Sequence, residues 1–234
     1  MDLAQIEKLN NEMEGKTSLA VLDYFVSNFS DKIGFATSFG VEDQVITQKL
    51  FSLKKKIKIF TLDTGRLFPE TYELIDKTTS RYKLNIDIYF PNSSEVETMV
   101  NSKGINLFYE SIENRKLCCG VRKIEPLKRA LSNLDIWISG LRREQSPTRS
   151  DMKLVEWDAN NGLIKINPLI EWTEKECWDY VKKNNIPYNT LHDKGFLSIG
   201  CQPCTRAIDE GEDVRAGRWW WEDPDSKECG LHKR

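Results

Sequence analysis

The sequence predicts an α/β protein with a doubly wound, mainly parallel sheet and helices on both of its faces. Short apolar runs, typical of buried strands, alternate with longer stretches in which apolar residues recur every three to four positions, as they do in helices. The chain has 234 residues, of which 39% are hydrophobic and 30% charged, as is typical of a soluble globular protein.

The first part of the chain shows this alternation most clearly. Residues 1–30 carry two helical patterns, and the second has an apolar stripe that includes Leu22 and Phe25. Strands are expected at 33–37, 57–62, 86–90 and 136–139. Helices are expected around Val45 to Phe51 and at about 69–82, 95–103 and 122–131.

The second part is less regular. The segments 152–157 and 163–166 indicate a β-hairpin, and Thr173 to Glu176 has the pattern of a capping box that opens a helix to about Asn184. Cys177 falls on that helix and is expected to pack in the core. We predict one main α/β domain over 1–209 and a C-terminal extension over 210–234.

Charge and composition exclude several classes of function. The net charge of −2 gives no bulk attraction to nucleic acid or membranes, and no apolar run is long enough to cross a bilayer. The N-terminus lacks a signal-peptide pattern, so a cytoplasmic location is expected. In that compartment the six cysteines are expected to bind metal or do chemistry rather than form disulfides.

Ligands of doubly wound sheets bind beyond the carboxyl ends of the strands. The turn Ser38-Phe39-Gly40 follows the first strand and leads into a helix N-terminus, which indicates a small anion site. Arginines share the same expected rim and favour an anionic small substrate: Arg66, Arg142, Arg143 and Arg149.

Four cysteines form two pairs, Cys118-Cys119 and Cys201-Gln202-Pro203-Cys204. Adjacent cysteines cannot easily bind one tetrahedral ion, but they can reach two irons of a cluster. The pattern therefore favours a 4Fe–4S cluster held by Cys118, Cys119, Cys201 and Cys204. A structural zinc and a thioredoxin-like dithiol at Cys201 and Cys204 remain as alternatives.

Cys229 is the sixth residue from the C-terminal end, next to Gly230, with cationic residues close in sequence. Chain ends are rarely tied down, and nearby positive charge favours the thiolate form of a cysteine. Cys229 is therefore predicted to be a mobile nucleophile that visits a fixed site. The alternative is a spare cysteine in a frayed tail.

Ordered motifs from about Ile33 to His232 closely resemble those of the assimilatory adenylyl-sulfate (APS) reductases, relatives of the phosphoadenylyl-sulfate (PAPS) reductases. The motifs are SFGVE from Ser38, LDTGRLFPETY from Leu62, CCGVRKIEPL from Cys118, SGLRREQSPTR from Ser139, NPLIEWT from Asn167, LHDKGFLSIGCQPCTR from Leu191, RAGRWWWE from Arg215 and KECGLH from Lys227.

The resemblance implies an adenine nucleotide alpha-hydrolase-like fold and a defined activity. Cys229 would attack the sulfate sulfur of APS, giving an S-sulfocysteine and AMP, and thioredoxin or glutaredoxin would then release sulfite for cysteine biosynthesis. Lys123 and His232 would assist at the reacting end of the substrate. The implied substrate contacts are Ser38, Phe39, Gly40, Leu62, Thr64, Gly65, Arg66, Arg142, Arg143, Arg215 and Arg218.

Several alternatives remain open at this point. Arg142 or Arg143 could simply pair with Glu144, and the three tryptophans Trp219–Trp221 are expected to pack rather than contact a partner. The substrate could be PAPS, or both nucleotides. A nucleotide-binding iron–sulfur sensor and an adenylating ligase are rivals from other classes, and homo-oligomerisation is left undecided.

Overall fold

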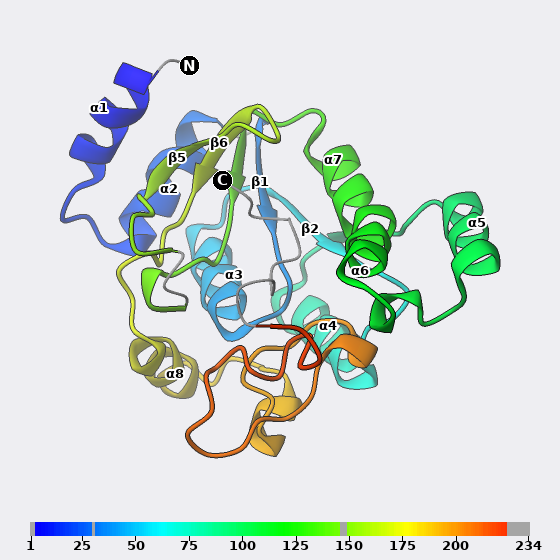
Figure 1. Ribbon diagram of the computed structural model, residues 1–234. Coiled ribbons are helices and arrows are strands. Elements are labelled where there is room, and N and C mark those ends of the chain that lie inside the picture. The colour runs from blue at the N-terminus through cyan, green and yellow to red at the C-terminus, as the bar shows by residue number, and fades with distance from the viewer. Residues whose placement is uncertain (1–2, 30, 146–148, 224–234) are drawn as a thin grey trace. The chain divides into compact units, whose positions relative to one another are not determined.

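A computed structural model describes residues 3–29, 31–145 and 149–223 of the chain. The strands form one six-stranded sheet in the order β3-β2-β1-β4-β6-β5 (Figure 1). Their bounds are β1 (Ile33–Ala36), β2 (Lys58–Leu62), β3 (Ile86–Tyr89), β4 (Ile136–Ile138), β5 (Val155–Asp158) and β6 (Leu163–Ile166).

The sheet is mainly parallel, as predicted. β1 pairs in parallel with β2 and with β4, and β4 pairs in parallel with β6. β5 runs antiparallel to β6, with Val155 opposite Ile166, which confirms the predicted hairpin. Both side chains are fully buried, so this face of the hairpin continues the core that the parallel strands begin.

Eight α-helices are described in the residues that the structure covers. They are α1 (Leu3–Met13), α2 (Ser18–Asn28), α3 (Val41–Leu53), α4 (Pro69–Tyr82), α5 (Ser93–Lys103), α6 (Ile112–Cys119), α7 (Glu125–Leu131) and α8 (Glu174–Lys183). The predicted capping box of α8 is confirmed, because Thr173 Oγ1 accepts from the Glu176 amide at 3.2 Å while the Glu176 carboxylate accepts from the Thr173 amide at 2.7 Å.

The region of the vicinal cysteines differs from the prediction. The expected helix at 122–131 is α7, and it is preceded by a π-helical turn over Gly120–Ile124 and by α6, which was not predicted. The buried residues of α6 are Arg115, Cys118 and Cys119. Because this face lacks an aliphatic stripe, hydrophobic periodicity could not reveal the helix.

The chain divides into two compact units, each made of three segments. The first unit contains Met1–Phe60, Glu73–Asp87 and Asn133–Asn189, and the second contains Thr61–Tyr72, Ile88–Ser132 and Thr190–Arg234. These divisions do not coincide with the expected boundary after residue 209. The separate C-terminal extension therefore stays a prediction.

The first unit has the larger apolar core. Helix α2 contributes Phe25, helix α3 contributes Val45, and strands β1 and β4 contribute Phe35 and Ile138, all fully buried. Cys177 of α8 is also fully buried in this core, which confirms its predicted packing role. Burial of apolar surface is the main stabilising contribution here.

The second unit has a smaller core that includes cysteines. Met99, Leu107, Phe108 and Trp219 pack there with Cys118, Cys201 and Cys204.

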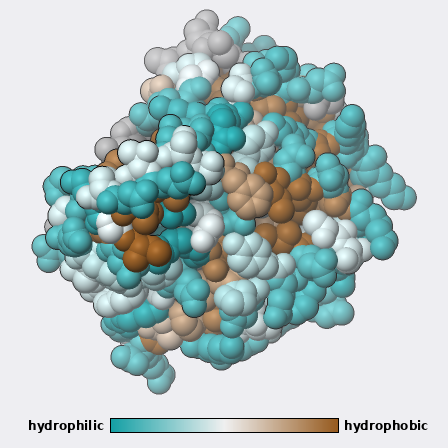
Figure 2. All heavy atoms as spheres, turned by 90° about the vertical axis from the view of Figure 1, so that its right-hand side faces the viewer, coloured by the Kyte–Doolittle hydropathy of each residue, from teal (hydrophilic) through white to brown (hydrophobic). Residues whose placement is uncertain are grey.

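Figure 2 shows the face seen from the right of Figure 1, where apolar side chains lie at the surface among hydrophilic ones. In the part of the chain that the structure describes, no helix is long and apolar enough to cross a membrane.

Two leucines of α2 provide a matched test of the core. Leu22 is fully buried, whereas Leu19 is 38% exposed. We expect Leu22→Ala to lower the free energy of unfolding by about 2–5 kcal/mol through lost burial and a residual cavity, and Leu19→Ala by less than about 1 kcal/mol. Urea unfolding measures both, and equal losses would contradict the assignment of the buried face.

Candidate functional site

The first unit contains the topological switch point of the sheet. The chain runs from β1 through β2 to β3 on one side of β1 and then returns to β4 on its other side, so the strand order reverses at β1. A crevice forms beyond the carboxyl ends of strands at such a point. The turn Ser38–Gly40 follows β1, and Gly140 follows β4. A Cβ atom on Gly140 would lie 2.2 Å from Asp43 Oδ1 and 3.2 Å from Glu42 Cβ, so a side chain at this position would displace the first turn of α3 or its carboxylates.

The turn after β1 has an unusual backbone. Phe39 has a φ of 61°, and its ring is buried with Leu74 and Ile75. Gly40 is the N-cap residue of α3 and makes no side-chain capping bond. The turn predicted to bind an anion is thus fixed by its buried aromatic ring at the start of a helix, where amide groups and the helix dipole favour negative charge.

Asp43 supplies a carboxylate to this turn from within the chain. Its Oδ2 accepts from the Ser38 amide at 2.5 Å and from Ser38 Oγ at 2.8 Å. Burial raises the pKa of Asp43 from 3.8 to about 7, and the nearby Glu42 carboxylate adds to the rise, although the bonds from Ser38 oppose it. The conformation of Ser38 is therefore coupled to a carboxyl group that can titrate near neutral pH.

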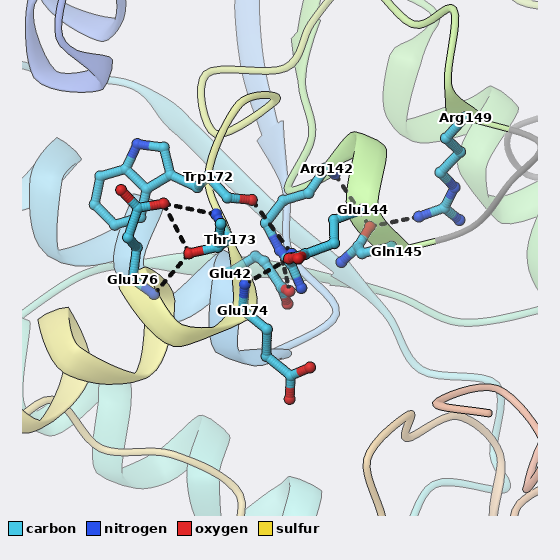
Figure 3. A network of polar contacts seen from close by, with 9 residues as sticks. All are labelled: Glu42, Arg142, Glu144, Gln145, Arg149, Trp172, Thr173, Glu174 and Glu176. Carbon is cyan, nitrogen blue, oxygen red and sulfur yellow. Dashed lines mark hydrogen bonds and ion pairs between the residues drawn. The ribbon is translucent and has the colours of Figure 1, made fainter. Parts of the chain in front are cut away.

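Arg142 lies in a network of carboxylates (Figure 3). Its Nε donates to Glu42 Oε1 at 2.8 Å, and its Nη1 donates to Glu144 Oε2 at 3.0 Å and to the Trp172 carbonyl at 3.3 Å. The Arg142 side chain is only 5% exposed. The sequence alternative of pairing with Glu144 is confirmed, and a substrate anion would have to compete with two carboxylates for this guanidinium.

The same network reaches α8. Glu144 Oε2 also accepts from the Glu174 amide in the first turn of that helix at 2.8 Å. Arg143 donates from Nε to the Met152 carbonyl at 2.8 Å and forms an ion pair with Glu171. Arg149 donates to Gln145. Anion binding by Arg142 and Arg143 stays a prediction, and the observed contacts assign them to holding the loop after β4.

The second unit contains the four predicted metal-binding cysteines, and it brings them together. Cys118, Cys119, Cys201 and Cys204 are all buried and line one cavity of about 20 Å³. Besides apolar side chains, the lining contains four cations: Arg66, Arg115, Arg122 and Lys123. No carboxylate or imidazole is among the described residues that line it.

Two local structures present these thiols. Cys118 and Cys119 end α6, and the π-helical turn Gly120–Ile124 that follows widens the backbone directly after them. Such turns occur frequently at functional sites. Cys201 precedes a 3₁₀ turn over Gln202–Cys204, whose start is fixed by a bond from the Gln202 amide to the Arg66 carbonyl at 2.8 Å.

The surroundings distinguish three of the four thiols electrostatically. Burial opposes ionisation of Cys201, but the Lys123 ammonium and a hydrogen bond with Thr64 Oγ1, 3.2 Å from the sulfur, lower the pKa of that thiol. Burial raises the pKa of Cys118, and burial with the neighbouring Cys201 raises the pKa of Cys204 to about 12. Among Cys118, Cys201 and Cys204, Cys201 is thus the thiol that the folded chain itself favours as a thiolate.

The other predicted substrate residues of the second unit have varied surroundings. Gly65 has a φ of 70°, and Arg66 donates to the Ile105 carbonyl at 2.7 Å and to Asn106 Oδ1 at 2.9 Å. Leu62 is half-buried at the end of β2, and the Arg215 amide donates to Asp213 Oδ1 at 2.8 Å. Arg218 is buried against the Trp219 ring. Cys229 and His232 lie outside the described residues.

The donor set around the cysteine cavity fits an anionic, sulfur-rich group. Trp219 Nε1 and Arg122 Nε are buried donors without an acceptor, and both residues line the cavity. Sulfides and thiolates would accept such bonds. In residues 3–29, 31–145 and 149–223 no three His, Cys, Asp or Glu side chains are grouped closely enough to hold one metal ion. The ligands of an iron–sulfur cluster bind different irons, so they do not have to converge on one ion.

Sequence comparison decides the family. The phosphoadenosine phosphosulfate reductase domain matches residues 32–207, which is most of the chain. The chain belongs to this family. The match spans both the turn after β1 and the four cysteines, so both candidate sites lie within the family domain.

Relatives with known names support a narrower grouping. A protein of Allochromatium vinosum named adenosine 5'-phosphosulfate reductase is 53% identical over 204 residues, covering 87% of this chain and 80% of the relative. A protein of Burkholderia cepacia with the same name is 46% identical over 233 residues, covering 99% of this chain and 93% of the relative.

Solved structures agree with the fold. The phosphoadenylyl-sulfate reductase of Candida auris, in a phosphate complex, has a TM-score of 0.76 at 28% identity and covers 89% of this chain and 98% of its own. The FMN adenylyltransferase of Candida glabrata has a TM-score of 0.60 at 18% identity, covering 89% of this chain and 69% of its own, which shows a shared fold alone.

Two residues around these sites, Asp43 and Arg115, have no distinctive signal in the sequence. Asp43 follows Ser38 by five positions and looks like an ordinary acidic residue of a first helical turn. Arg115 is fully buried on a helix that periodicity did not reveal, and its partner Glu222 lies 107 residues later. The fold alone shows that these groups belong to the sites.

Asp43 makes the stability of the first unit depend on pH. Because its folded pKa of about 7 exceeds 3.8, the contribution is fully present below about pH 4 and is lost as the pH rises through 7. An asparagine at this position cannot ionise, so we expect the stability of Asp43→Asn relative to wild type to rise by about 2 kcal/mol from pH 5 to pH 8.

Urea unfolding at several pH values measures this difference. Asp179→Asn, which removes a carboxylate that is 59% exposed, serves as the control and should leave the pH profile of wild type nearly unchanged. A difference between Asp43→Asn and wild type that is constant with pH would contradict the raised pKa.

Proposed function

We propose that this protein reduces APS to sulfite and AMP, with thioredoxin as the electron donor, in sulfate assimilation and cysteine biosynthesis. One observation carries the proposal: four buried cysteines line one cation-rich cavity in a chain that is 46–53% identical to proteins named adenosine 5'-phosphosulfate reductase. A cytoplasmic location agrees with the use of reduced thiols.

The first chemical step is transfer of a sulfonate group to Cys229. The Cys229 thiolate attacks the sulfate sulfur of APS, a new S–S bond forms, and the bond from sulfur to the bridging oxygen breaks. AMP leaves with the electron pair. Such a displacement depends on in-line approach and on cations around the charge that develops on the leaving group.

The second step uses an external dithiol. A thiolate of thioredoxin attacks Cys229 Sγ and forms a mixed disulfide, and sulfite leaves with the electron pair of the broken S–S bond. The second thioredoxin cysteine then resolves the mixed disulfide, which restores the Cys229 thiol and oxidises thioredoxin. The two electrons therefore come from the partner.

The chain's own residues bind and orient the nucleotide. Ser38, Phe39 and Gly40 form an anion-binding turn at the start of α3, whose conformation depends on Asp43. Leu62, Thr64, Gly65 and Arg66 form the adenosine side. Lys123, Arg215, Arg218 and His232 contact the phosphate and sulfate, while Arg142 and Arg143 hold the loop after β4 in addition to any anion contact.

The four cysteines Cys118, Cys119, Cys201 and Cys204 would hold a 4Fe–4S cluster. The dithiol partner supplies both electrons, so the cluster does not need to transfer any. When bound, it would supply a fixed distribution of charge beside Lys123. Lys123 lines the same cavity as the four thiols. Its ammonium group can therefore attract the anionic end of the substrate toward the cysteines.

A second substrate remains a specific alternative. The domain that matches the chain is named for phosphoadenosine phosphosulfate, and a structural relative reduces PAPS according to its name. PAPS differs from APS by a 3′-phosphate, so the same sulfur chemistry applies to both. The choice depends on contacts at the ribose.

Sulfonate transfer predicts a covalent intermediate. We expect protein mixed with APS in the absence of reductant to gain one sulfonate on Cys229, because no dithiol is present to release it. Intact-protein mass spectrometry and peptide mapping measure the adduct, with APS and PAPS compared side by side. Faster labelling by PAPS would overturn the choice of APS.

Cys229→Ala is the matched variant for this experiment. It should form no adduct and no sulfite while its affinity for AMP stays close to that of wild type, because AMP binding does not need the nucleophile. A nucleotide-binding sensor would not depend on Cys229 in this way. An adduct on another cysteine would reject the assignment of the nucleophile.

Cluster binding predicts a coloured protein. Purified without oxygen, wild type should show broad visible absorbance and equal amounts of iron and sulfide. Cys204→Ala removes one ligand and should lose most of this absorbance, whereas Cys177→Ala, which changes a cysteine buried in the core of the other unit, should keep it. A colourless wild type with one equivalent of zinc would favour the structural zinc.

A further inference from the structure

The last described stretch of the chain, Arg218–Asp223, is fixed against the cysteine-bearing loops of the second unit. Arg218 forms an isolated antiparallel bridge with Thr205, and the Trp219 amide donates to the Cys204 carbonyl at 3.2 Å. Trp219 has a φ of 42°, which is strained for a tryptophan. Such a conformation persists only where the surroundings determine it.

An ion pair attaches this stretch to helix α6. Arg115 Nε donates to Glu222 Oε1 at 2.9 Å, and Arg115 Nη2 donates to Glu222 Oε2 at 2.7 Å. The side chains of Arg115 and Glu222 are 0% and 3% exposed. Two parallel bonds of this kind fix direction as well as distance, and loss of either partner would leave an uncompensated buried charge.

Trp219 connects the ion pair to the cysteine cavity. The Arg115 guanidinium lies 4.8 Å from its ring centroid and the Arg218 guanidinium lies 4.7 Å from it. The Trp219 ring itself lines the cavity with Cys118, which follows Arg115 by three positions on α6. The ion pair therefore joins helix α6, which carries Cys118 and Cys119, to the stretch Arg218–Asp223, which packs on Cys201 and Cys204.

The position of Glu222 limits where Cys229 can go. Cys229 follows Glu222 by seven residues. Seven residues span at most about 25 Å when fully extended. A fixed Glu222 therefore raises the effective concentration of the nucleophile near the cysteine cavity, whereas release of Glu222 would let the segment start from a wider range of positions.

We propose that Arg115 and Glu222 are positioning residues for sulfonate transfer, because their buried ion pair fixes the point from which the chain leads to Cys229. This inference rests on the proposed function of Cys229. Neither residue contacts the reacting atoms in this mechanism. The pair acts through the geometry of approach, to which displacement reactions are sensitive.

The test compares Glu222→Gln with wild type in a single turnover at saturating APS without reductant. We expect the rate of adduct formation on Cys229 to fall by about tenfold or more, while AMP affinity and iron content stay within about twofold of wild type. Glu222→Asp keeps the charge and should recover at least part of the rate. It also serves as the measured variant if Glu222→Gln does not fold.

Glu212→Gln is the matched control. It breaks another two-bond arginine pair of the same unit, in which Arg206 contacts both Glu212 oxygens at 2.8 Å and both side chains are about one-third exposed. Its adduct rate should equal that of wild type. Alkylation of Cys229 by iodoacetamide in the absence of nucleotide should be equally fast in all variants, since the intrinsic reactivity of the thiol is unchanged.

Different results separate the two proposals. Equal adduct rates in Glu222→Gln and wild type would reject the positioning role alone. A parallel fall of adduct rate, AMP affinity and iron content would also reject it, because that pattern indicates general loss of structure. The lack of any adduct on wild type would reject the proposed function and, with it, the role of the pair in that transfer.

Discussion

Four buried thiols and four cations, of which Arg115 and Arg122 are also buried, line one small cavity in the second unit, and the structure of that unit depends on keeping these groups together. Buried charges are costly unless they are paired, and thiolates are costly unless cations or metals stabilise them. Here Lys123 and Thr64 favour the thiolate of Cys201, while Arg115 is neutralised by Glu222. The second unit thus adds electrostatic pairing to a small apolar core.

The first unit has to hold two polar loops at the end of a hydrophobic sheet. Asp43 binds the turn after β1, and Arg142 joins Glu42 at the start of α3 to the loop after β4. Glu144 extends this network to the first turn of α8. Each contact ties a loop to a helix N-terminus, where a carboxylate is favoured by the helix dipole. The turn predicted to bind the nucleotide is therefore supported by charged groups of the chain itself.

Both units place their candidate sites where regular structure ends. Cys118 and Cys119 lie where α6 changes into a π-helical turn, Cys201 precedes a 3₁₀ turn, and Ser38 follows β1. Backbone strain occurs at the same places, with positive φ at Phe39 and Trp219. These conformations are stable because buried side chains surround them, so the packing of each core is what gives the polar groups their positions.

Local patterns were enough to predict the succession of strands and helices, the capping box at Thr173 and the likeness of the motifs to one family, because a strand or a cap depends on residues only a few positions apart. The vicinal and C-x-x-C spacings also predicted that the four cysteines share one site, since together they suit a cluster.

Helix α6 was not predicted because its buried face is polar. Which charges pair could not be predicted either, because Arg142 and Glu42 are 100 residues apart, Arg115 and Glu222 are 107 apart, and the hydrogen-bonded Thr64 and Cys201 are 137 apart. Nothing in the local sequence distinguishes an arginine that will meet a buried carboxylate from one that will bind a ligand. Only the tertiary structure decides which of the two an arginine does. A carboxylate that folding has brought close is already held in place, so pairing with it costs no further conformational entropy.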